Sequence, residues 1–282
     1  MDRDIDIDRD HEPRKDPPIP DRDTERDRET RVHRPVRSGR QIYSISPDER
    51  ETMYDMGRFR VLSAEDLAAL KYRGNQAHMR QDLRSLAAQG LVQRKSVWTG
   101  RDGETDTFWT LTKTGKRLIQ RLYPVPKGQA IYTGFVKPAE LRHDAAIYRM
   151  YHLEAARIEK EGGRIRRVVL DYELKKKAYS PLAKAKALSP AEYVKRQEEI
   201  AREHGLKVVN RHIVLPDLRI EYEDRHGVSA QIDLEVASES YHGSHAAEKA
   251  AAGFRIYASA DTAARLSRAL EEREITAEIL SL

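Results

Sequence analysis

Apolar residues recur at helical spacing through the segment 59–118. They predict a short helix over residues 63–70, with Ser63 as its N-cap, and a longer helix over residues 75–89. Gly90 then lies at the position where a residue in the left-handed conformation commonly ends a helix. One buried stripe is expected along the longer helix, made of Met79, Leu83, Leu86 and Ala87.

The polar loop 99–104 is flanked by two pairs of β-forming residues, Val97-Trp98 and Phe108-Trp109. The loop is rich in turn residues, so we expect a hairpin over residues 91–111 and a closing helix after it. Helix, turn, helix and hairpin are the elements of a winged helix-turn-helix. The motifs Gly-Leu-Val-x-Arg and Leu-Thr-x-x-Gly in this region resemble winged-helix transcription factors and plasmid replication or mobilisation proteins.

The polar face of the longer helix carries long hydrogen-bond donors, of the kind that reach base edges and phosphates in a major groove. Residues 63–123 contain eleven Lys and Arg against six Asp and Glu, a sign of charge that favours counterion release from DNA. Double-stranded DNA is therefore the expected partner, and protein contacts are the alternative use of the same fold. The hairpin over residues 91–111 is the wing of this motif. The expected DNA-binding residues are Gln76, Arg80, Gln81 and Arg84 on the longer helix and Lys95 and Arg101 on the wing.

A second pattern begins at Pro138, where apolar positions predict a long helix to about Glu161. Its early pair, His143-Asp144, is either functional or simply a polar helix start. A strand is expected next, over residues 165–174. Strands and helices then alternate, which favours an α/β sheet covered by helices. The expected pieces are 212–222, 228–237, 243–253, 254–259, 261–273 and 275–282.

Within this region Pro216-Asp217 is followed, after fifteen residues, by Asp233-Leu234-Glu235. The order of elements and these acids resemble the PD-(D/E)xK nuclease superfamily, which implies a restriction-endonuclease-like α/β domain. By that resemblance Asp217 and Asp233 would be metal ligands for Mg²⁺, a hard cation that prefers oxygen and can activate water. The sequence departs from the motif because Glu235 occupies the place of the lysine. Lys249 in the next helix is a candidate for a relocated cation, and an inactive site is the alternative.

Residues 59–257 resemble the replication-relaxation family of plasmids and mobile elements. The resemblance rests on the combination of an N-terminal winged helix, the Pro-Asp pair, an acidic strand and Lys249. The resemblance implies a DNA-binding regulator or accessory factor in replication or mobilisation. We expect a homodimer, since winged helices often read two half-sites. The competing hypothesis is a Mg²⁺-dependent DNA endonuclease or nickase that the winged helix targets, with Asp217, Asp233, Glu235 and Lys249 as catalytic residues. A protein-interaction module is a third hypothesis.

Residues 1–41 alternate Arg with Asp and contain several prolines, so this segment is expected to be disordered. Its end carries an arginine at every third position, which suits either a basic arm for a minor groove or a solvated linker. The expected division is a charged tail (1–41), a winged helix-turn-helix domain (42–123), a connector (124–137) and an α/β domain (138–282) with a basic insertion at 175–207.

Composition adds limits to this picture. The chain has 282 residues and a formal charge of +5, enough length for two domains. It contains no cysteine, which excludes a disulfide framework and a thiolate zinc site and fits a reducing compartment. It also lacks a run of 18 apolar residues, so no membrane span and no membrane partner are expected. A cytoplasmic location is the resulting expectation.

Overall fold

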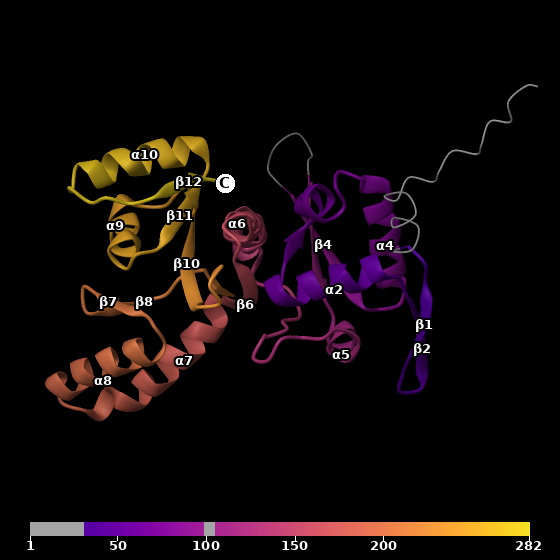
Figure 1. The fold of residues 1–282 in the computed structure, drawn as a ribbon, viewed down its shortest axis with the longest axis horizontal. Coiled ribbons are helices and arrows are strands. Elements are labelled where there is room, and N and C mark those ends of the chain that lie inside the picture. Colours follow the sequence, from indigo (N-terminus) through magenta and orange to yellow (C-terminus); the bar gives the residue numbers. More distant parts are fainter. Residues whose placement is uncertain (1–30, 99–104) are drawn as a thin grey trace, which may run out of the picture.

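The structure is a computed structural model that describes residues 31–98 and 105–282 (Figure 1). These ranges combine helices with several separate β-sheets, so the expectation of a mixed α and β protein is confirmed. Among the helices described, none is both long and apolar enough to cross a lipid bilayer.

The N-terminal half contains the element order expected of the winged helix-turn-helix. Strands β3, β5 and β4 form one antiparallel sheet in that spatial order. The elements are α2 (Pro47–Phe59), β3 (Leu62–Ser63), α3 (Ala64–Asp66), the π-helical turn η1 (Leu67–Lys71), α4 (Gln76–Ala88), β4 (Val92–Trp98), β5 (Thr105–Leu111) and α5 (Lys113–Leu122).

Helix α4 has a capping residue at its start, a glycine just beyond its end and a buried apolar stripe along one side. The Asn75 side chain accepts a hydrogen bond from the His78 N–H (3.0 Å), and Gly90 has a φ of +69° beyond the other end. Met79, Leu83 and Leu86 are buried beneath the helix as expected, whereas Ala87, the fourth residue expected in this stripe, is exposed. The shorter helix differs from the expectation, since α3 is a single turn and residues 67–71 continue as a π-helix.

A further hairpin corrects the expected boundary of the disordered tail. Strands β1 (Arg34–Ser38) and β2 (Gln41–Ile45) pair across a turn, so the prediction of disorder up to residue 41 is wrong for residues 34–41. The hairpin is anchored by Tyr43 and Ile45, which are buried, and by the Gln89 amide, which bonds both the N–H and the carbonyl of Ser44 (2.8 and 2.9 Å). Residues 1–30 lie outside the described ranges.

The C-terminal half is built on a five-stranded sheet of order β12-β11-β10-β9-β6. Strands β6, β9 and β10 are antiparallel neighbours, whereas β11 and β12 run parallel to β10 and β11 respectively. Helix α6 covers one face of this sheet, and helices α9 and α10 cover the other (Figure 1). The elements are η2 (Pro138–Glu140), α6 (Leu141–Lys160), β6 (Arg164–Leu170), α7 (Asp171–Lys184), η3 (Ala185–Ala187), α8 (Pro190–Glu203), β7 (Lys207–Val209), β8 (His212–Val214), β9 (Leu218–Glu223), β10 (Ser229–Ala237), α9 (Gly243–Ala251), β11 (Arg255–Ala258), α10 (Ala260–Glu271) and β12 (Ile279–Ser281).

Two of the expected strands differ from the alternation, one by ending early and one by being divided. Strand β6 stops at Leu170, and the residues expected to extend it begin α7, so the lysines of residues 175–177 lie on a helix. The insertion thus starts at Asp171 and comprises α7, α8 and the β7–β8 hairpin, around an apolar cluster of its own. The strand expected over residues 212–222 is divided by Pro216 into β8 and β9.

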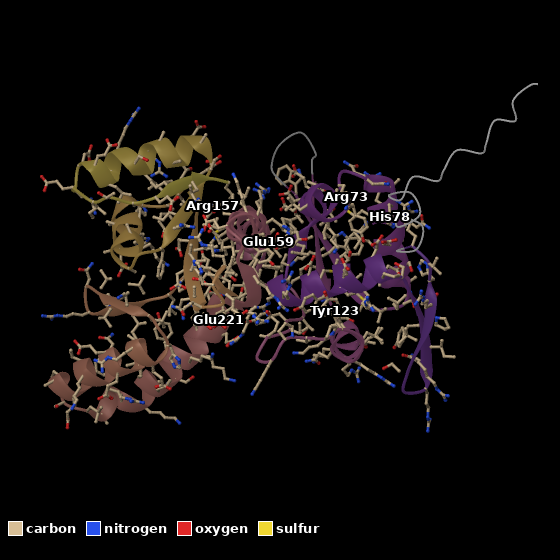
Figure 2. All side chains as sticks on the ribbon, viewed as in Figure 1. Arg73, His78, Tyr123, Arg157, Glu159 and Glu221 are labelled. Atoms are coloured by element: carbon tan, nitrogen blue, oxygen red, sulfur yellow. The ribbon has the colours of Figure 1, made fainter. Side chains whose placement is uncertain are left out.

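The two halves share one continuous hydrophobic core, although the sequence suggested a connector between them. The rings of Tyr148 and Tyr151 on α6 pack on Phe59 of α2, with centroids 5.1 and 4.8 Å away. Figure 2 shows side chains filling the space between α6 and α2. The connector is itself packed, because Ile131 is buried within the same core. Helix α6 therefore belongs to both halves.

Gly115 provides a test of the packing between α5 and the wing. A Cβ atom at this position would lie 2.1 Å from the Leu91 carbonyl oxygen and 2.7 Å from a Leu111 methyl. We predict that Gly115→Ala lowers the free energy of unfolding by about 3 kcal/mol, measured by urea denaturation, because backbone must move. Gly57→Ala is the matched control. Its Cβ would meet side-chain atoms and no backbone, namely two methyls of Ile131 at 2.8 and 3.4 Å and one of Leu111 at 3.4 Å, so a loss near 1 kcal/mol is expected. Equal losses would contradict this packing.

Candidate functional site

A cluster of charged side chains forms where β9 begins beside the middle of β10. Asp217 enters the sheet by donating its N–H to the Leu234 carbonyl (3.1 Å). Its carboxylate then accepts two hydrogen bonds, from the Val236 N–H at 2.9 Å and from His143 Nε2 at 3.2 Å. His143 comes from the first turn of α6. The strand and the helix thus fix Asp217 from two sides.

Glu235, on β10, is the second acid of this cluster. One of its oxygens accepts from Lys249 Nζ at 2.8 Å and the other from the Tyr241 hydroxyl at 2.8 Å. Lys249 reaches across from α9 and also donates to the Leu215 carbonyl (2.6 Å). The structure therefore brings together Asp217, Glu235 and Lys249, three of the four expected catalytic residues.

The fourth, Asp233, does not belong to the cluster. It lies opposite Arg219 in the antiparallel pairing of β9 with β10, and the guanidinium binds both of its oxygens (2.6 and 2.8 Å). Arg219 is only 4% exposed and also donates to the carbonyls of His204 and Gly205 (2.6 and 3.0 Å). Asp233 thus neutralises a buried cation that ties the insertion to the sheet.

Burial and mutual charge set the ionisation of the cluster. Burial and the charge of Asp217 together raise the pKa of Glu235 to about 7, against the opposing effect of Lys249. Burial lowers the pKa of His143, but the hydrogen bond and charge of Asp217 outweigh it and raise the pKa to about 9. Burial raises the pKa of Asp217, but its bond to His143 and that imidazolium charge lower it below the usual range. At neutral pH the cluster therefore holds a carboxylate–imidazolium pair.

A cavity of about 330 Å³ opens on this cluster. Asp217, just before β9, and Lys249 of α9 line one side of it, and Lys175 and Tyr179 of α7 line the other. Its outer wall thus comes from the insertion. The cavity has the size of a small ligand site.

Whether Mg²⁺ can bind at this cluster depends on the ligand atoms that its side chains offer. Within the described ranges, no group of three or more His, Cys, Asp or Glu side chains is placed to hold a metal ion. Two carboxylates, Asp217 and Glu235, do lie together, and Mg²⁺ commonly uses one or two carboxylates with waters and substrate phosphates as its other ligands. The residues fit Mg²⁺ in that mode, with Glu235 in place of the expected ligand Asp233.

The second candidate surface is the outer face of α4, where Gln76, Arg80, Gln81 and Arg84 are all exposed. Arg80 donates to Gln76 Oε1 (3.0 Å), and Arg84 donates to the Arg80 carbonyl (3.0 Å). These bonds align the side chains along the helix.

A groove of about 620 Å³ separates this helix from the wing. Its floor is apolar, formed by residues such as Met79 and Trp109, and Arg94 lines its far wall. Lys95, which the sequence placed among the DNA-binding residues, points to the other side of the sheet and lies over the Phe135 ring at 5.9 Å. Arg94 is therefore the basic residue of β4 that faces the groove. Arg101, also expected to bind DNA, lies outside the described residues.

Sequence reasoning missed four residues of these sites: Arg94, His143 as a partner of Asp217, Arg219 and Tyr241. The His143-Asp144 pair was a visible signal, since it occupies an early turn of a long helix. Which wing residue faces the groove, and which residue lies opposite Asp233, depends on sheet register, which the sequence alone did not determine.

No protein-family model and no curated protein matches this chain. Among solved structures, the crystal structure of Bacillus subtilis PadR in complex with operator DNA matches at 14% sequence identity, covering 56% of this chain and 91% of that chain, with a TM-score of 0.23. This similarity is too low to assign a fold or a function to the chain.

The raised pKa of Asp144, the residue after His143, can be tested through the pH dependence of stability. Its carboxylate accepts from the Tyr172 hydroxyl (2.7 Å), and burial raises its pKa to about 6. A carboxyl whose pKa is raised by folding binds more protons in the folded state, so its effect on stability becomes unfavourable as pH rises from about 4 to 6. Relative to wild type, Asp144→Asn should therefore gain roughly 2–3 kcal/mol between pH 4 and pH 7, measured by urea denaturation. A difference that does not vary with pH would contradict the assignment.

Proposed function

We propose that this protein binds double-stranded DNA through a winged helix, with α4 as the helix that enters the major groove. The observation that carries the proposal is the exposed row of Arg80 and Arg84 on α4, facing Arg94 across the groove. Arginine is the side chain that most often reads guanine and that contacts phosphates. The charge excess of the segment supports the same partner.

Hydrogen bonds on the inner side of α4 favour a helix that is held rigidly while it contacts DNA. Asp82, on the inner side of the helix, accepts from the Tyr72 hydroxyl (3.0 Å), and Tyr72 also bonds Thr52 of α2 (2.9 Å). Because these groups are buried, rotation of α4 would break bonds that water could not replace. The exposed side chains are thus presented on a fixed backbone, which lowers the entropy lost on binding.

The biological setting of the proposal rests on the resemblance to the replication-relaxation family. By that resemblance the protein acts on a plasmid or another mobile element, as a regulator or accessory factor in replication or mobilisation. A homodimer that reads two half-sites remains part of the proposal, because paired winged helices bind operators in this way.

The arginines of α4 test DNA binding directly. We predict that the double variant Arg80→Ala, Arg84→Ala weakens binding to duplex DNA about tenfold or more, in fluorescence anisotropy titrations over a salt series. The slope of log affinity against log salt should also fall by about 1 for each phosphate contact that is lost. Lys95→Ala is the matched control, since Lys95 faces away from the groove, and it should bind as wild type does. Wild-type affinity in the double variant would refute the assignment of α4.

A second function, a DNA endonuclease or nickase, is favoured by one observation: Asp217, Glu235 and Lys249 lie in one cluster. The order α6, β6, β9, β10, α9 and β11 supports a PD-(D/E)xK-like core, because in that superfamily the acids lie at the same two strands. Here the lysine comes from α9 instead of β10. We propose Asp217 and Glu235, rather than Asp217 and Asp233, as the acids of this site.

Each residue of the cluster has a definable part in this second function. Mg²⁺, when bound, would activate water and stabilise charge on the scissile phosphate. Asp217 and Glu235 would hold the ion, and His143 and the Val236 N–H hold the Asp217 carboxylate in place. Lys249 would hold its ammonium beside the reacting phosphate, where negative charge increases.

Supercoiled plasmid tests the second function. In the presence of Mg²⁺ or Mn²⁺ we predict nicking that is lost in Asp217→Ala, Glu235→Ala and Lys249→Ala, measured by agarose gel electrophoresis. Asp233→Asn is the control, because Asp233 binds Arg219 and not the cluster; once circular dichroism has established its fold, it should nick as wild type does. Plasmid binding without any cutting would rule out the nuclease and leave the DNA-binding proposal intact.

A further inference from the structure

The wing has two faces with different surroundings. Side chains alternate along β4, so Lys95 and Val97 share one face, and Arg94, Ser96 and Trp98 share the other. Val97 packs against an apolar cluster at the start of α6. Asp106, its partner on β5, binds Arg142 of α6 (2.6 Å). The wing is thus held from behind by the C-terminal half, and among the described residues its other face lines the groove beside α4.

The groove-side face of β4 ends in an exposed tryptophan. Trp98 is 67% exposed at the last position of β4, whereas the chain's other tryptophan, Trp109, is 8% exposed and packs in the core. Tryptophan is enriched at interfaces because its ring offers a large apolar area together with an N–H donor. Because the wing is anchored, the ring is presented on a fixed strand.

Trp98 lies four residues beyond Arg94 on the same face of β4, and the charges of that face indicate which partner the indole meets. The groove that Arg94 shares with α4 is lined, among its described residues, by three arginines (Arg80, Arg84 and Arg94) and one glutamate (Glu65). This excess of positive charge is complementary to a nucleic-acid backbone. Proteins that bind unpaired nucleic acid combine a basic groove that holds the backbone with aromatic side chains on which bases stack, and this face of the wing carries both.

We propose that Trp98 is a base-stacking residue, which stacks on an unpaired base of the DNA held between α4 and the wing. The inference rests on the proposed DNA binding and adds a preference to it. A base in an intact duplex must leave its stack before it can meet the indole, whereas a base in a bubble or fork is already available. DNA with unpaired bases beside the duplex is therefore the favoured ligand.

Affinity measurements on two DNAs test this preference. The probes are a fluorescein-labelled duplex of random sequence and the same DNA with three mismatched pairs at its centre. Wild type should bind the mismatched DNA about tenfold more tightly, and Trp98→Ala should lose that gain. Trp98→Phe should keep most of the gain because it retains an aromatic face, and Trp98→Leu should not. Val228→Ala, which truncates a side chain that is 60% exposed in the turn between β9 and β10, is the control.

Tryptophan fluorescence gives an independent readout. Saturating mismatched DNA should quench the emission of wild type, and Trp98→Phe should lose the larger part of the quenching although binding by anisotropy persists. Trp109, on the groove floor, accounts for the part that is left. Tight binding by Trp98→Ala or Trp98→Leu with the full preference, or an unchanged wild-type emission, would overturn the stacking role while DNA binding stands. Absence of binding to either DNA by wild type would instead overturn the proposed function.

Discussion

The burial of helix α6 between two halves of the chain is the constraint on which the rest of the structure depends. At the centre of this contact, the largely buried Arg58 of α2 pairs with Asp55 at 2.6 Å, and the Tyr148 hydroxyl of α6 donates to the same carboxylate at 3.2 Å. The guanidinium also lies over the ring of Tyr151, 5.1 Å from its centroid. Loss of Asp55 would leave a buried cation without a partner, an arrangement that is strongly unfavourable.

Because α6 is shared, the two candidate surfaces have a fixed relation. Arg149 of α6 binds Asp66 of α3 (2.9 Å), close to the helix that presents the arginines. The first turn of the same α6 provides His143 to Asp217. DNA held at α4 would therefore lie at a set position relative to the acidic cluster. This geometry suits a protein that reads DNA at one place and acts on it, or binds a second segment, at another.

Much of this arrangement could be predicted from the sequence, since helical periodicity and caps are local properties. Helix α4, the long helix α6 and the alternation after residue 212 follow from them. Properties that depend on pairing between distant segments could not be predicted in the same way. Asp233 and Glu235 have the same parity on β10, and contacts from distant segments separate their roles. Arg219 on β9 binds Asp233, whereas Lys249 and Tyr241 bind Glu235.

The same limit applies to the wing and to the N-terminal segment. Parity alone does not tell which of Arg94 and Lys95 faces α4, because that depends on what packs behind the sheet. The β1–β2 hairpin was missed because its anchors, Tyr43 and Ile45, lie beyond the arginine-rich pattern that suggested disorder. The composition of this segment suggested disorder, whereas its hydrogen bonds to Gln89 at the end of α4 hold it as a hairpin.

The most direct measurement is amide hydrogen exchange of the full chain with and without duplex DNA. The central claim predicts slower exchange along α4 and in β4, where the DNA would cover the backbone and stiffen it. The rival surface is the lysine-rich helix α7, which also carries positive charge. Slower exchange in α7 and α8, with none in α4, would show that DNA binds the insertion instead and would contradict the account.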